Sequence, residues 1–470
     1  MKILYVTSEA APFIKTGGLG DVSQALPAAL SSREGVEVCV MLPYYKSIKD
    51  NPSFELEFVT SFGMMLSWRS LHVGVFRAMW DGVTYYFIDN EYYFYRDGAY
   101  GNYDDGERYA YFCKAVIECL SHIGFVPDII HCNDWQTGLI PLFLKAYDWY
   151  PQVRTVFTIH NIEYQGKAPG NFLQNVLGLS EDWRGAADHD GMVNFMKCGI
   201  ELADRVTTVS RTYSHEIRHA YFAHGLESVL GRNAHKLSGI VNGINTSVFD
   251  PSTDSALDAN YCAQDISGKK KNKLALQAQL GLPQNADIPM VAMISRLVSH
   301  KGLELVEYVA EELSRYQIQF VVLGTGEERF ERLFRDMAWH NPDRFSANIT
   351  FDGALANRLY AGADFFLMPS KSEPCGLSQM IAMRYGTIPI VRETGGLVDT
   401  VPPLNTQTLE GAGFTFKAFN AHDMLDALNR ALTFYHDGVA REQVIGQIMS
   451  ADYGWKGPAE EYLRLYESIL

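Results

Sequence analysis

The 470-residue sequence lacks the apolar run of roughly 18 residues that a membrane-spanning helix needs. The apolar stretch at its start ends at Ser8 and Glu9, so it is too short for the core of a signal peptide and predicts a buried first strand. Its seven cysteines are scattered, odd in number and without a Cys-x-x-Cys pair. We therefore expect neither a disulfide framework nor a zinc site, and the pattern favours a reducing cytoplasm.

Positive charge is also scarce. Lys and Arg number 40 against 55 Asp and Glu, which leaves a net charge of −15. An acidic chain repels nucleic acid and anionic membranes, so neither is expected as a main partner, and an anionic substrate would need cations gathered locally. The hydrophobic share of 47% and the charged share of 20% are typical of a globular protein and exclude a disordered or collagen-like chain.

The sequence does contain an alternation of short apolar runs and longer helical stretches, and this pattern occurs twice. The expected strands of the first half are residues 2–7, 36–42, 128–132, 154–159 and 205–209, and those of the second half are residues 288–294, 317–323, 364–368 and 387–391. Continuous apolar strands separated by helices predict doubly wound parallel sheets. The fold class is therefore α/β, with two Rossmann-like domains.

A strand end, an Asn-Gly turn and a proline make residues 238–251 the best interdomain linker, and we place the boundary after Gly243. The polar stretch that follows is expected at the surface, with the Lys269-Lys270-Lys271 run as a solvated helix start. Residues 458–470 carry apolar side chains at helical spacing behind a proline. This last helix packs either on the second domain or back on the first, and the residues alone leave both open.

Three glycines and a lysine follow the first expected strand, in Lys-Thr-Gly-Gly-Leu-Gly at 15–20. Glycine lets a backbone approach a phosphate closely, and the helix behind it offers free N–H groups. A dinucleotide fingerprint fails here, because Ser23 replaces its third glycine and the second strand ends without an acidic residue for a ribose. A plain structural turn is the remaining alternative to an anion site.

Polar residues also follow two later strands of the first half. Asp134 lies just beyond one strand, and His160 lies just beyond the next. Ligands of open α/β sheets bind at these carboxyl ends. His160 alone is more typical of a core histidine, but the clustering of polar strand ends makes both residues site candidates. No Ser or Cys lies in a nucleophile-elbow sequence, so a hydrolase of that kind has no support.

In the second half, Arg296 and Lys301 flank a strand-to-helix turn. A guanidinium fork and a point charge together suit a pyrophosphate, and a simple surface pair is the alternative. Glu373 stands between a strand and a glycine-bearing helix start, and the Thr-Gly-Gly turn at 394–396 offers backbone N–H groups to an anion. Residues 85–112 are rich in aromatic side chains, which suit either a surface for sugar rings or a core.

Taken together, these motifs resemble bacterial glycogen synthase and plant starch synthase. The resemblance rests on Lys-Thr-Gly-Gly-Leu at 15–19, His-Asn-x-x-Tyr-Gln-Gly at 160–166, Glu-Pro-Cys-Gly-Leu at 373–377 and Thr-Gly-Gly-Leu at 394–397, with further matches at 203–210, 242–244 and 455–466. It covers essentially the whole chain in the family's order. It implies a GT-B fold, with two domains facing across a cleft, and a retaining transfer of glucose from ADP-glucose to the non-reducing end of an α-1,4-glucan such as glycogen or a maltooligosaccharide.

The resemblance also implies a separate role for each part of the chain. Residues 1–243 would form the acceptor and catalytic domain, residues 244–454 the nucleotide-sugar domain, and residues 455–470 a helix that returns to the first domain. The implied catalytic residues are Glu373, His160, Lys15 and Asp134. The implied donor-binding residues are Gly17, Gly18, Asp21, Asn242, Arg296, Lys301, Phe351, Cys375, Gly376, Leu377, Thr394, Gly395 and Gly396, and the acceptor would lie on Tyr92, Tyr93 and Tyr95.

Charge predicts how such a reaction would run. Fixed cations at Arg296 and Lys301, with helix N-termini, would stabilise the leaving diphosphate in place of a metal, so no metal and no other cofactor is expected. Asp188-His189-Asp190 matches the Asp-x-Asp motif by which other glycosyltransferases bind manganese, but it lies in a loop-like stretch and we interpret it as fortuitous. No second carboxylate is an evident partner for Glu373, which favours same-face attack assisted by the leaving phosphate.

The chain departs from the wider class of retaining GT-B enzymes at one position, and two other functions compete with the transfer of glucose from ADP-glucose. Ile381 stands where many retaining GT-B enzymes have a second glutamate for the ribose; ADP-glucose enzymes also depart there, so ribose recognition stays unassigned. The alternatives are a UDP-glucose-dependent relative, such as a sucrose- or trehalose-type synthase, and a catalytically silent glucan-binding protein. The full-length motif match argues against the first. The presence of Lys15, His160, Arg296, Lys301 and Glu373 argues against the second, since a binding module need not keep both halves of a donor site. We expect a cytoplasmic, glycogen-associated bacterial enzyme, and no oligomeric state is predicted.

Overall fold

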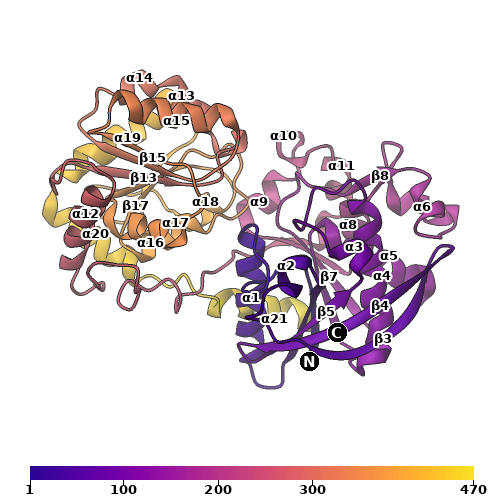
Figure 1. The fold of residues 1–470 in the computed structure, drawn as a ribbon. Helices are drawn as coiled ribbons and strands as arrows, with labels where there is room; N and C mark the ends of the chain where they lie inside the picture. The colour runs from indigo at the N-terminus through magenta and orange to yellow at the C-terminus, as the bar shows by residue number, and fades with distance from the viewer. The chain divides into compact units, whose positions relative to one another are not determined.

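The computed structural model describes all 470 residues and divides them into two compact units, each built on its own sheet (Figure 1). Unit 1 comprises Met1–Asn242 together with Trp455–Leu470, and unit 2 comprises Gly243–Gly454. The chain therefore leaves unit 1 at the Asn-Gly turn and returns to it for its last helix. None of the helices combines the length and apolar character that a membrane crossing would need.

Unit 1 holds a nine-stranded sheet in the order β12-β11-β7-β6-β1-β2-β5-β4-β3. Its strands are β1 (Lys2–Val6), β2 (Glu37–Pro43), β3 (Glu57–Leu66), β4 (Arg69–Trp80), β5 (Val83–Asp89), β6 (Ile129–Asn133), β7 (Arg154–Ile159), β11 (Arg205–Thr208) and β12 (Leu237–Gly239). All of them run in one direction except β4, which pairs antiparallel with both β3 and β5. A second, three-stranded sheet joins β8 (Lys167–Pro169), β10 (Met192–Asn194) and β9 (Asp188–His189).

The five strands expected in this half are confirmed, but a purely parallel sheet is wrong for unit 1. The β3–β4 hairpin adds two antiparallel strands to the edge of the sheet. Along β3 and the ends of β4, exposed side chains alternate with covered ones, because one face meets α4 (Asp105–Ile123) and the other meets solvent. Such strands carry no continuous apolar run and so escape a search for buried parallel strands.

The helices of unit 1 cover the sheet and link its strands. In chain order they are α1 (Gly18–Ser31), α2 (Lys46–Lys49), α3 (Glu91–Phe94), α4, η1 (Trp135–Thr137), α5 (Ile140–Tyr147), α6 (Phe172–Asn175), η2 (Glu181–Trp183), α7 (Arg184–Ala187), α8 (Phe195–Leu202), α9 (Arg211–Glu216), α10 (Ala220–Ala223), α11 (Glu227–Arg232), η3 (Ala234–Lys236) and α21 (Lys456–Glu467).

The C-terminal helix α21 packs in unit 1 beside α1, although the two lie at opposite ends of the chain (Figure 1). Tyr462 and Tyr466 on α21 are fully buried. The Tyr466 hydroxyl lies 2.7 Å from Nδ1 of His131 in β6, and burial lowers the pKa of His131 to about 3, so this histidine is neutral. Arg33, just after α1, forms an ion pair of 3.1 Å with Glu460. A buried aromatic face and a polar contact thus hold the last helix on unit 1.

Unit 2 holds a six-stranded sheet, all parallel, in the order β15-β14-β13-β16-β17-β18. The strands are β13 (Met290–Ile294), β14 (Gln319–Leu323), β15 (Phe345–Asn348), β16 (Phe365–Met368), β17 (Ile388–Arg392) and β18 (Phe414–Phe416). The helices are α12 (Ser267–Gln279), η4 (Ser299–Lys301), α13 (Leu303–Tyr308), α14 (Ala310–Leu313), α15 (Glu328–His340), α16 (Gly353–Gly362), α17 (Ser378–Arg384), α18 (Gly396–Thr400), α19 (Ala421–Tyr435) and α20 (Gly438–Ser450). The four strands expected in this half are confirmed.

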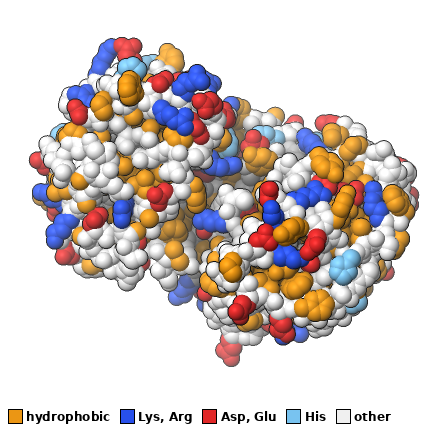
Figure 2. Space-filling model, in the orientation of Figure 1, with side chains coloured by type: hydrophobic (Ala, Val, Ile, Leu, Met, Phe, Trp, Pro, Cys, Tyr) orange, Lys and Arg blue, Asp and Glu red, His pale blue; other side chains and the backbone are white.

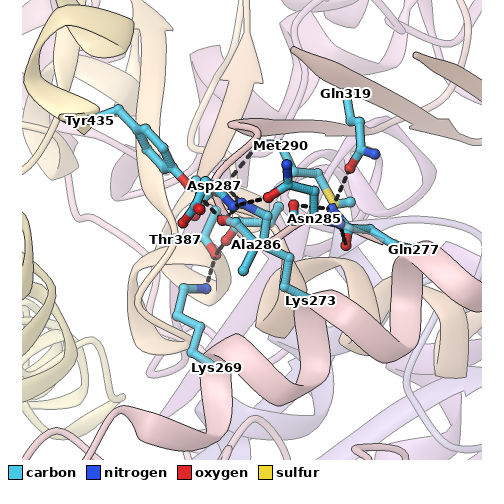
Figure 3. A network of polar contacts seen from close by, with 12 residues as sticks. Lys269, Lys273, Gln277, Asn285, Ala286, Asp287, Met290, Gln319, Thr387 and Tyr435 are labelled. Carbon is cyan, nitrogen blue, oxygen red and sulfur yellow. Dashed lines mark hydrogen bonds and ion pairs between the residues drawn. The ribbon is translucent and has the colours of Figure 1, made fainter. Parts of the chain in front are cut away.

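The expectation of a solvated lysine run at the start of α12 is wrong for its first member. Lys269 is only 8% exposed, and its ammonium donates to Oγ1 of Thr387 at 2.7 Å (Figure 3). It also donates to the Ala361 carbonyl at 2.9 Å. One turn later Lys273 is also buried and binds Asp364 at 2.6 Å. The two lysines hold α12 on the core of unit 2, because their ammonium groups bind carbonyl and carboxylate oxygens there. A solvated lysine would bind water instead.

Candidate functional site

The loop between β1 and α1 is shaped around Lys15. Its ammonium forms an ion pair of 2.8 Å with Asp21 in the first turn of α1, and both side chains are partly exposed. A Cβ at Gly20 would lie 3.1 Å from Cβ and Cγ of Lys15, so glycine lets the lysine cross the helix start. Gly17 caps this helix without a side-chain bond, and Gly18 begins it. The predicted lysine and glycines therefore lie at one helix N-terminus, where free N–H groups favour an anion.

Asp134 links the carboxyl ends of two neighbouring strands. It follows β6 with φ 58° and ψ 179°, a backbone conformation unusual for a residue other than glycine. Its Oδ1 accepts hydrogen bonds from the backbone N–H groups of His160 at 2.7 Å and Asn161 at 3.3 Å, just beyond β7. Although part of the residue is accessible, desolvation raises the pKa of Asp134 to about 7, and the charge of Glu9 adds to that rise.

His160 is neutral and fixed in one tautomer. Desolvation lowers its pKa to about 3. Its Nε2 lies 2.9 Å from Oδ1 of Asn133, whose amide nitrogen already donates to the Val6 carbonyl. Because that oxygen can only accept, Nε2 carries the hydrogen and Nδ1 keeps its lone pair. The histidine thus offers an acceptor atom to a ligand hydroxyl.

In unit 2, Glu373 is a buried carboxylate held by one lysine and one serine. Nζ of Lys301 lies 3.0 Å from Oε1 and 2.8 Å from Oε2 of Glu373, and the Ser370 hydroxyl donates to Oε2 at 2.9 Å. Glu373 is only 6% exposed. The lysine comes from the turn after β13 and the glutamate from the loop after β16, which are neighbouring strands of the sheet. Lys301 therefore has an ion-pair partner within unit 2 and is only 19% exposed, which does not fit the alternative of a simple surface pair with Arg296.

Glycines let the backbones of the two predicted turns lie close to the loop that carries Glu373. Gly395 has φ 47°, and a Cβ there would lie 2.0 Å from the Glu373 carbonyl oxygen. The N–H of Gly396 donates to that same oxygen at 3.0 Å. A Cβ at Gly302 would likewise lie 1.9 Å from the carbonyl oxygen of Pro369. Only glycine fits these positions, so the Thr-Gly-Gly turn and the Lys301 turn both lie against the loop that carries Glu373.

The remaining donor-site candidates differ in exposure. Arg296 is exposed and makes no ion pair within the chain, whereas Phe351 is 89% exposed and free to stack on a ligand ring. Asn242 is buried with its Oδ1 unpartnered. Ile381 lies buried on α17, so it offers nothing to a ribose. Gly376 and Leu377 lead into α17, while Cys375 and Thr394 are buried beside the glycine turn.

The tyrosines proposed for the acceptor divide into two groups. Tyr92 and Tyr95 are 65% and 43% exposed, but Tyr93 is only 1% exposed and its hydroxyl donates to Glu107. The expectation that Tyr93 contacts a glucan is therefore wrong, because α3 turns this side chain into the core. Tyr103, which the sequence analysis did not single out, is 92% exposed, and the guanidinium of Arg96 lies between it and Tyr92.

The Asp-x-Asp match has a local structural role. One Asp188 oxygen accepts from the Gly191 N–H at 3.1 Å, and the other lies 3.5 Å from Arg184. The Asp190 side chain is 91% exposed. These contacts form a turn between β9 and β10. That the reaction needs no metal stays a prediction.

On the face drawn in Figure 2, basic side chains stand singly or in small groups among acidic ones. That face therefore has no continuous basic surface of the kind that nucleic acids need.

Two residues with contacts to the Lys15 loop escaped the sequence analysis. Glu9, which there marked the end of an apolar run, accepts bonds from Thr16 and Gly17 beside Lys15. Tyr100 donates to the same carboxylate at 2.6 Å. A carboxylate directly after a buried strand was a readable signal for Glu9, whereas nothing in the local sequence separates Tyr100 from the tyrosines around it.

Comparison with known proteins places this geometry in a family. Residues 2–232 match the family described as "Starch synthase catalytic domain", and residues 278–442 match "Glycosyl transferases group 1". A glycogen synthase from Clostridium novyi (strain NT) is 48% identical over 477 residues, which is 100% of this chain and 99% of the relative. A glycogen synthase from Ligilactobacillus salivarius (strain UCC118) is 48% identical over 476 residues and all of both chains.

Solved structures agree with these relatives. The catalytic domain of starch synthase IV from Arabidopsis thaliana, bound to ADP and acarbose, superposes with a TM-score of 0.91 at 35% identity, over 99% of this chain and 98% of that one. Sucrose-phosphate synthase from Thermosynechococcus elongatus has a TM-score of 0.64 at 19% identity, over 100% of this chain and 98% of that one. This similarity shows a common fold and no more. With two α/β units, the motif residues at the carboxyl ends of their strands and relatives that match over full length, this chain belongs to the glycogen and starch synthase family of GT-B glycosyltransferases.

Proposed function

We propose that the protein transfers glucose from ADP-glucose to the non-reducing end of an α-1,4-glucan, with retention of configuration. The observation that carries the proposal is the buried carboxylate of Glu373, held by Lys301 and Ser370 and flanked by the Gly395-Gly396 turn. A nucleotide-sugar transferase needs such an arrangement, because cations and N–H groups can receive the charge of the leaving diphosphate. The ADP in the Arabidopsis starch synthase supports adenine over uracil.

In this proposal unit 2 binds the nucleotide. Arg296 and Lys301 contact the diphosphate, the Thr394–Gly396 turn lies against the loop that carries Glu373, and the exposed ring of Phe351 stacks on the adenine. Gly17, Gly18 and Asp21 shape the Lys15 loop of unit 1, and Lys15 adds a further cation. When the bond between glucose and phosphate breaks, negative charge grows on the diphosphate, and each fixed cation lowers the barrier.

We assign the contacts with the transferring glucose and its acceptor to neutral or acidic side chains. Nδ1 of His160 accepts a glucose hydroxyl, and Asp134 holds the histidine backbone in place. Glu373 lies by the transferring glucose, where its charge favours the positive character of the sugar ring in the transition state. With no second carboxylate to form a covalent intermediate, the acceptor hydroxyl attacks on the same face and passes its proton to the leaving phosphate, which retains the configuration. Asn242 and the Cys375–Leu377 stretch line the donor.

The reaction needs no metal in this proposal, because the cations are supplied by Arg296, Lys301 and Lys15. Its acceptor is glycogen or a maltooligosaccharide, bound through Tyr92 and Tyr95. Its compartment is the cytoplasm, since seven cysteines that form no disulfide, six of them buried, suit reducing conditions. Nucleic acids and membranes are not partners in this proposal.

Glucose incorporation tests the proposal. Purified protein is incubated with glycogen and either ADP-glucose or UDP-glucose, each carrying labelled glucose. We expect label in glycogen from ADP-glucose at a rate at least tenfold above that from UDP-glucose, and its release by an enzyme that cleaves only α-1,4 linkages. A preference for UDP-glucose would refute the donor assignment. Binding of glycogen without transfer from either donor would identify a glucan-binding protein instead.

A further inference from the structure

Glu9 is a buried carboxylate whose contacts all come from uncharged donors. It is 4% exposed. Its Oε2 accepts from the backbone N–H groups of Thr16 at 2.5 Å and Gly17 at 3.2 Å. Its Oε1 accepts from the Thr16 hydroxyl at 2.7 Å and from the Tyr100 hydroxyl at 2.6 Å. Hydrogen bonds to a buried charge are strong, so these four groups fix one another's positions.

Tyr100 is locked into this arrangement as a donor. Burial raises the pKa of its phenol well above the usual range, and the charge of Glu9 raises it further, so the hydroxyl stays protonated. Since that hydrogen goes to Glu9, the Ser8 hydroxyl at 2.8 Å must donate to the Tyr100 oxygen. Ser8 and Glu9 are consecutive residues after β1. The strand end therefore holds Tyr100 by two hydrogen bonds.

Tyr100 belongs to the segment between β5 and α4, residues 90–104, which also carries the exposed Tyr92 and Tyr95. We call it the aromatic segment. Its underside is fastened to α4, because Arg108 donates to the carbonyls of Tyr93 and Ala99, and the Tyr109 hydroxyl donates to Ala99 at 2.7 Å. The segment is also tied to α2 and the residue after it, through Lys49 with Glu91, Lys46 with Asp97 and Asp50 with Tyr95. Tyr100 is the residue that links it to Glu9.

On the other side of Glu9 lies the Lys15 loop. Three of the four donors to Glu9 come from Thr16 and Gly17, the two residues that follow Lys15 and precede α1. We infer that Glu9 and Tyr100 are positioning residues that couple binding of a glucan on the aromatic segment to the placement of Lys15. The inference rests on the proposed function, which assigns the glucan to Tyr92 and Tyr95 and the donor phosphates to Lys15. By linkage, bound donor tightens glucan binding by the same factor.

Two-substrate kinetics tests the coupling. Initial rates are measured with ADP-glucose and a maltooligosaccharide both varied, which gives the factor by which bound acceptor lowers the KM for ADP-glucose. We expect a factor of roughly five or more in the unaltered protein. Tyr100→Phe keeps the ring but loses the hydroxyl, so the factor should fall toward one. Glu9→Gln should do the same and lower kcat by about tenfold, because an amide cannot accept from all four donors.

Tyr109→Phe is the matched control. It also removes a buried tyrosine hydroxyl that binds the aromatic segment, but that hydroxyl does not contact Glu9. The coupling factor should therefore survive in Tyr109→Phe. Thr16→Val provides a second test at an exposed position, since it deletes one donor to Glu9 without disturbing a core, and should reduce the factor in part.

Hydrogen exchange tests the same coupling without any nucleotide sugar. Maltooligosaccharide should slow exchange of the Thr16 and Gly17 amides in the unaltered protein and in Tyr109→Phe, but not in Tyr100→Phe. Equal loss in Tyr100→Phe and Tyr109→Phe would overturn the inference, since it would show general loosening of the segment. So would an active enzyme whose ADP-glucose KM and amide exchange ignore the acceptor. Slowed exchange in a protein that does not use ADP-glucose would instead refute the proposed donor and leave the coupling standing.

Discussion

Lys301 and Glu373 form a two-pronged ion pair, with the ammonium 3.0 and 2.8 Å from the two carboxylate oxygens. Their side chains are 19% and 7% exposed. The lysine assigned to the diphosphate and the glutamate assigned to the sugar thus contact each other directly. Binding of a diphosphate would draw Lys301 away from Glu373, so the charge of that carboxylate would be felt more strongly by the sugar.

This pair predicts that Lys301→Ala loses stability as well as activity. Removing one partner of a buried ion pair leaves an uncompensated charge, which costs about 1–3 kcal/mol here after allowance for the partial exposure of Lys301. We expect a lower Tm in thermal unfolding and a fall in kcat of about 10²–10³. The double variant Lys301→Met with Glu373→Gln should regain most of the Tm and none of the activity. An unchanged Tm in Lys301→Ala would contradict the structural role.

Arg296→Ala should behave differently, because this guanidinium is exposed and makes no ion pair within the chain. We expect an unchanged Tm and a fall in kcat of about 10²–10³ with ADP-glucose. Arg315→Ala is the matched control, since it removes another exposed arginine of unit 2 whose only partner is Glu311 on the same helical turn. Normal turnover in Arg296→Ala would remove this residue from the diphosphate site.

Asp134 predicts a pH dependence of both stability and rate. Its pKa is raised to about 7 in the folded protein, so folding favours the protonated acid. The stability that it contributes is complete below the unfolded pKa and is lost as the pH rises through about 7. Asp134→Asn keeps an acceptor for the His160 N–H but carries no charge, so its Tm relative to the unaltered protein should be higher at pH 8 than at pH 5.

The rate offers a second measurement on the same group. If the ionised Asp134 is needed, kcat should rise with pH through about 7, and Asp134→Asn should lose that limb of the profile along with most of its activity. A profile that is flat between pH 6 and pH 8 in the unaltered protein would argue against an ionised Asp134 in turnover.

Lys269 predicts the opposite trend for stability. Burial lowers its pKa to about 7, with Asp364 acting against the shift and Lys273 and Arg441 adding to it. The unfolded chain therefore binds more protons above pH 7, and stability rises with pH from about 7 toward the unfolded pKa. The destabilisation caused by Lys269→Met should grow by about 2 kcal/mol between pH 7 and pH 9.

The neighbouring lysine is a matched control for that experiment. Lys270 belongs to the same run on α12 but is exposed, whereas Lys269 and Lys273 reach the polar contacts drawn in Figure 3. Lys270→Met should leave the pH dependence of unfolding unchanged. If Lys269→Met and Lys270→Met gave the same curve in chemical denaturation, the burial of Lys269 would not control its protonation.

Metal independence is the last prediction. Arg296, Lys301 and Lys15 supply the cations that the leaving diphosphate needs, so transfer of glucose should proceed at an unchanged rate in excess chelator. Loss of activity on chelation with recovery in manganese would contradict this and return attention to Asp188 and Asp190. Asp190→Asn, at a side chain that is 91% exposed, would then separate a metal ligand from a surface charge.

Much of the fold was predictable from local pattern. Strands β1, β2, β6, β7 and β11 of unit 1 and β13, β14, β16 and β17 of unit 2 lie within about two residues of the ranges expected from apolar runs. The antiparallel hairpin of β3 and β4 was missed, because a strand with one face in solvent carries an alternating pattern that short windows do not separate from a loop or helix.

Individual side chains also show what the sequence could predict and what it could not. Tyr92 and Tyr93 are adjacent and chemically alike, yet one is 65% exposed and the other 1%, because α3 points them in different directions. Lys269 and Lys270 divide in the same way on α12. Composition and motif identify such residues as candidates, but the direction of each side chain depends on what packs against its element.

The amino-acid sequence alone settled the α/β class, the repeated strand pattern and the residues of the glycine-rich turns, because hydrophobic periodicity and glycine at close approaches are local requirements. Folding in three dimensions decided which polar groups meet: Lys301 with Glu373, Lys15 with Asp21, and Glu9 with Tyr100. Lys301 and Glu373 are 72 residues apart, and Glu9 and Tyr100 are 91 apart. They meet because the carboxyl ends of the parallel strands in a sheet lie at one edge: β13 and β16 are neighbours, and β1 and β5 are separated by β2 alone. No local pattern in the chain records these pairings.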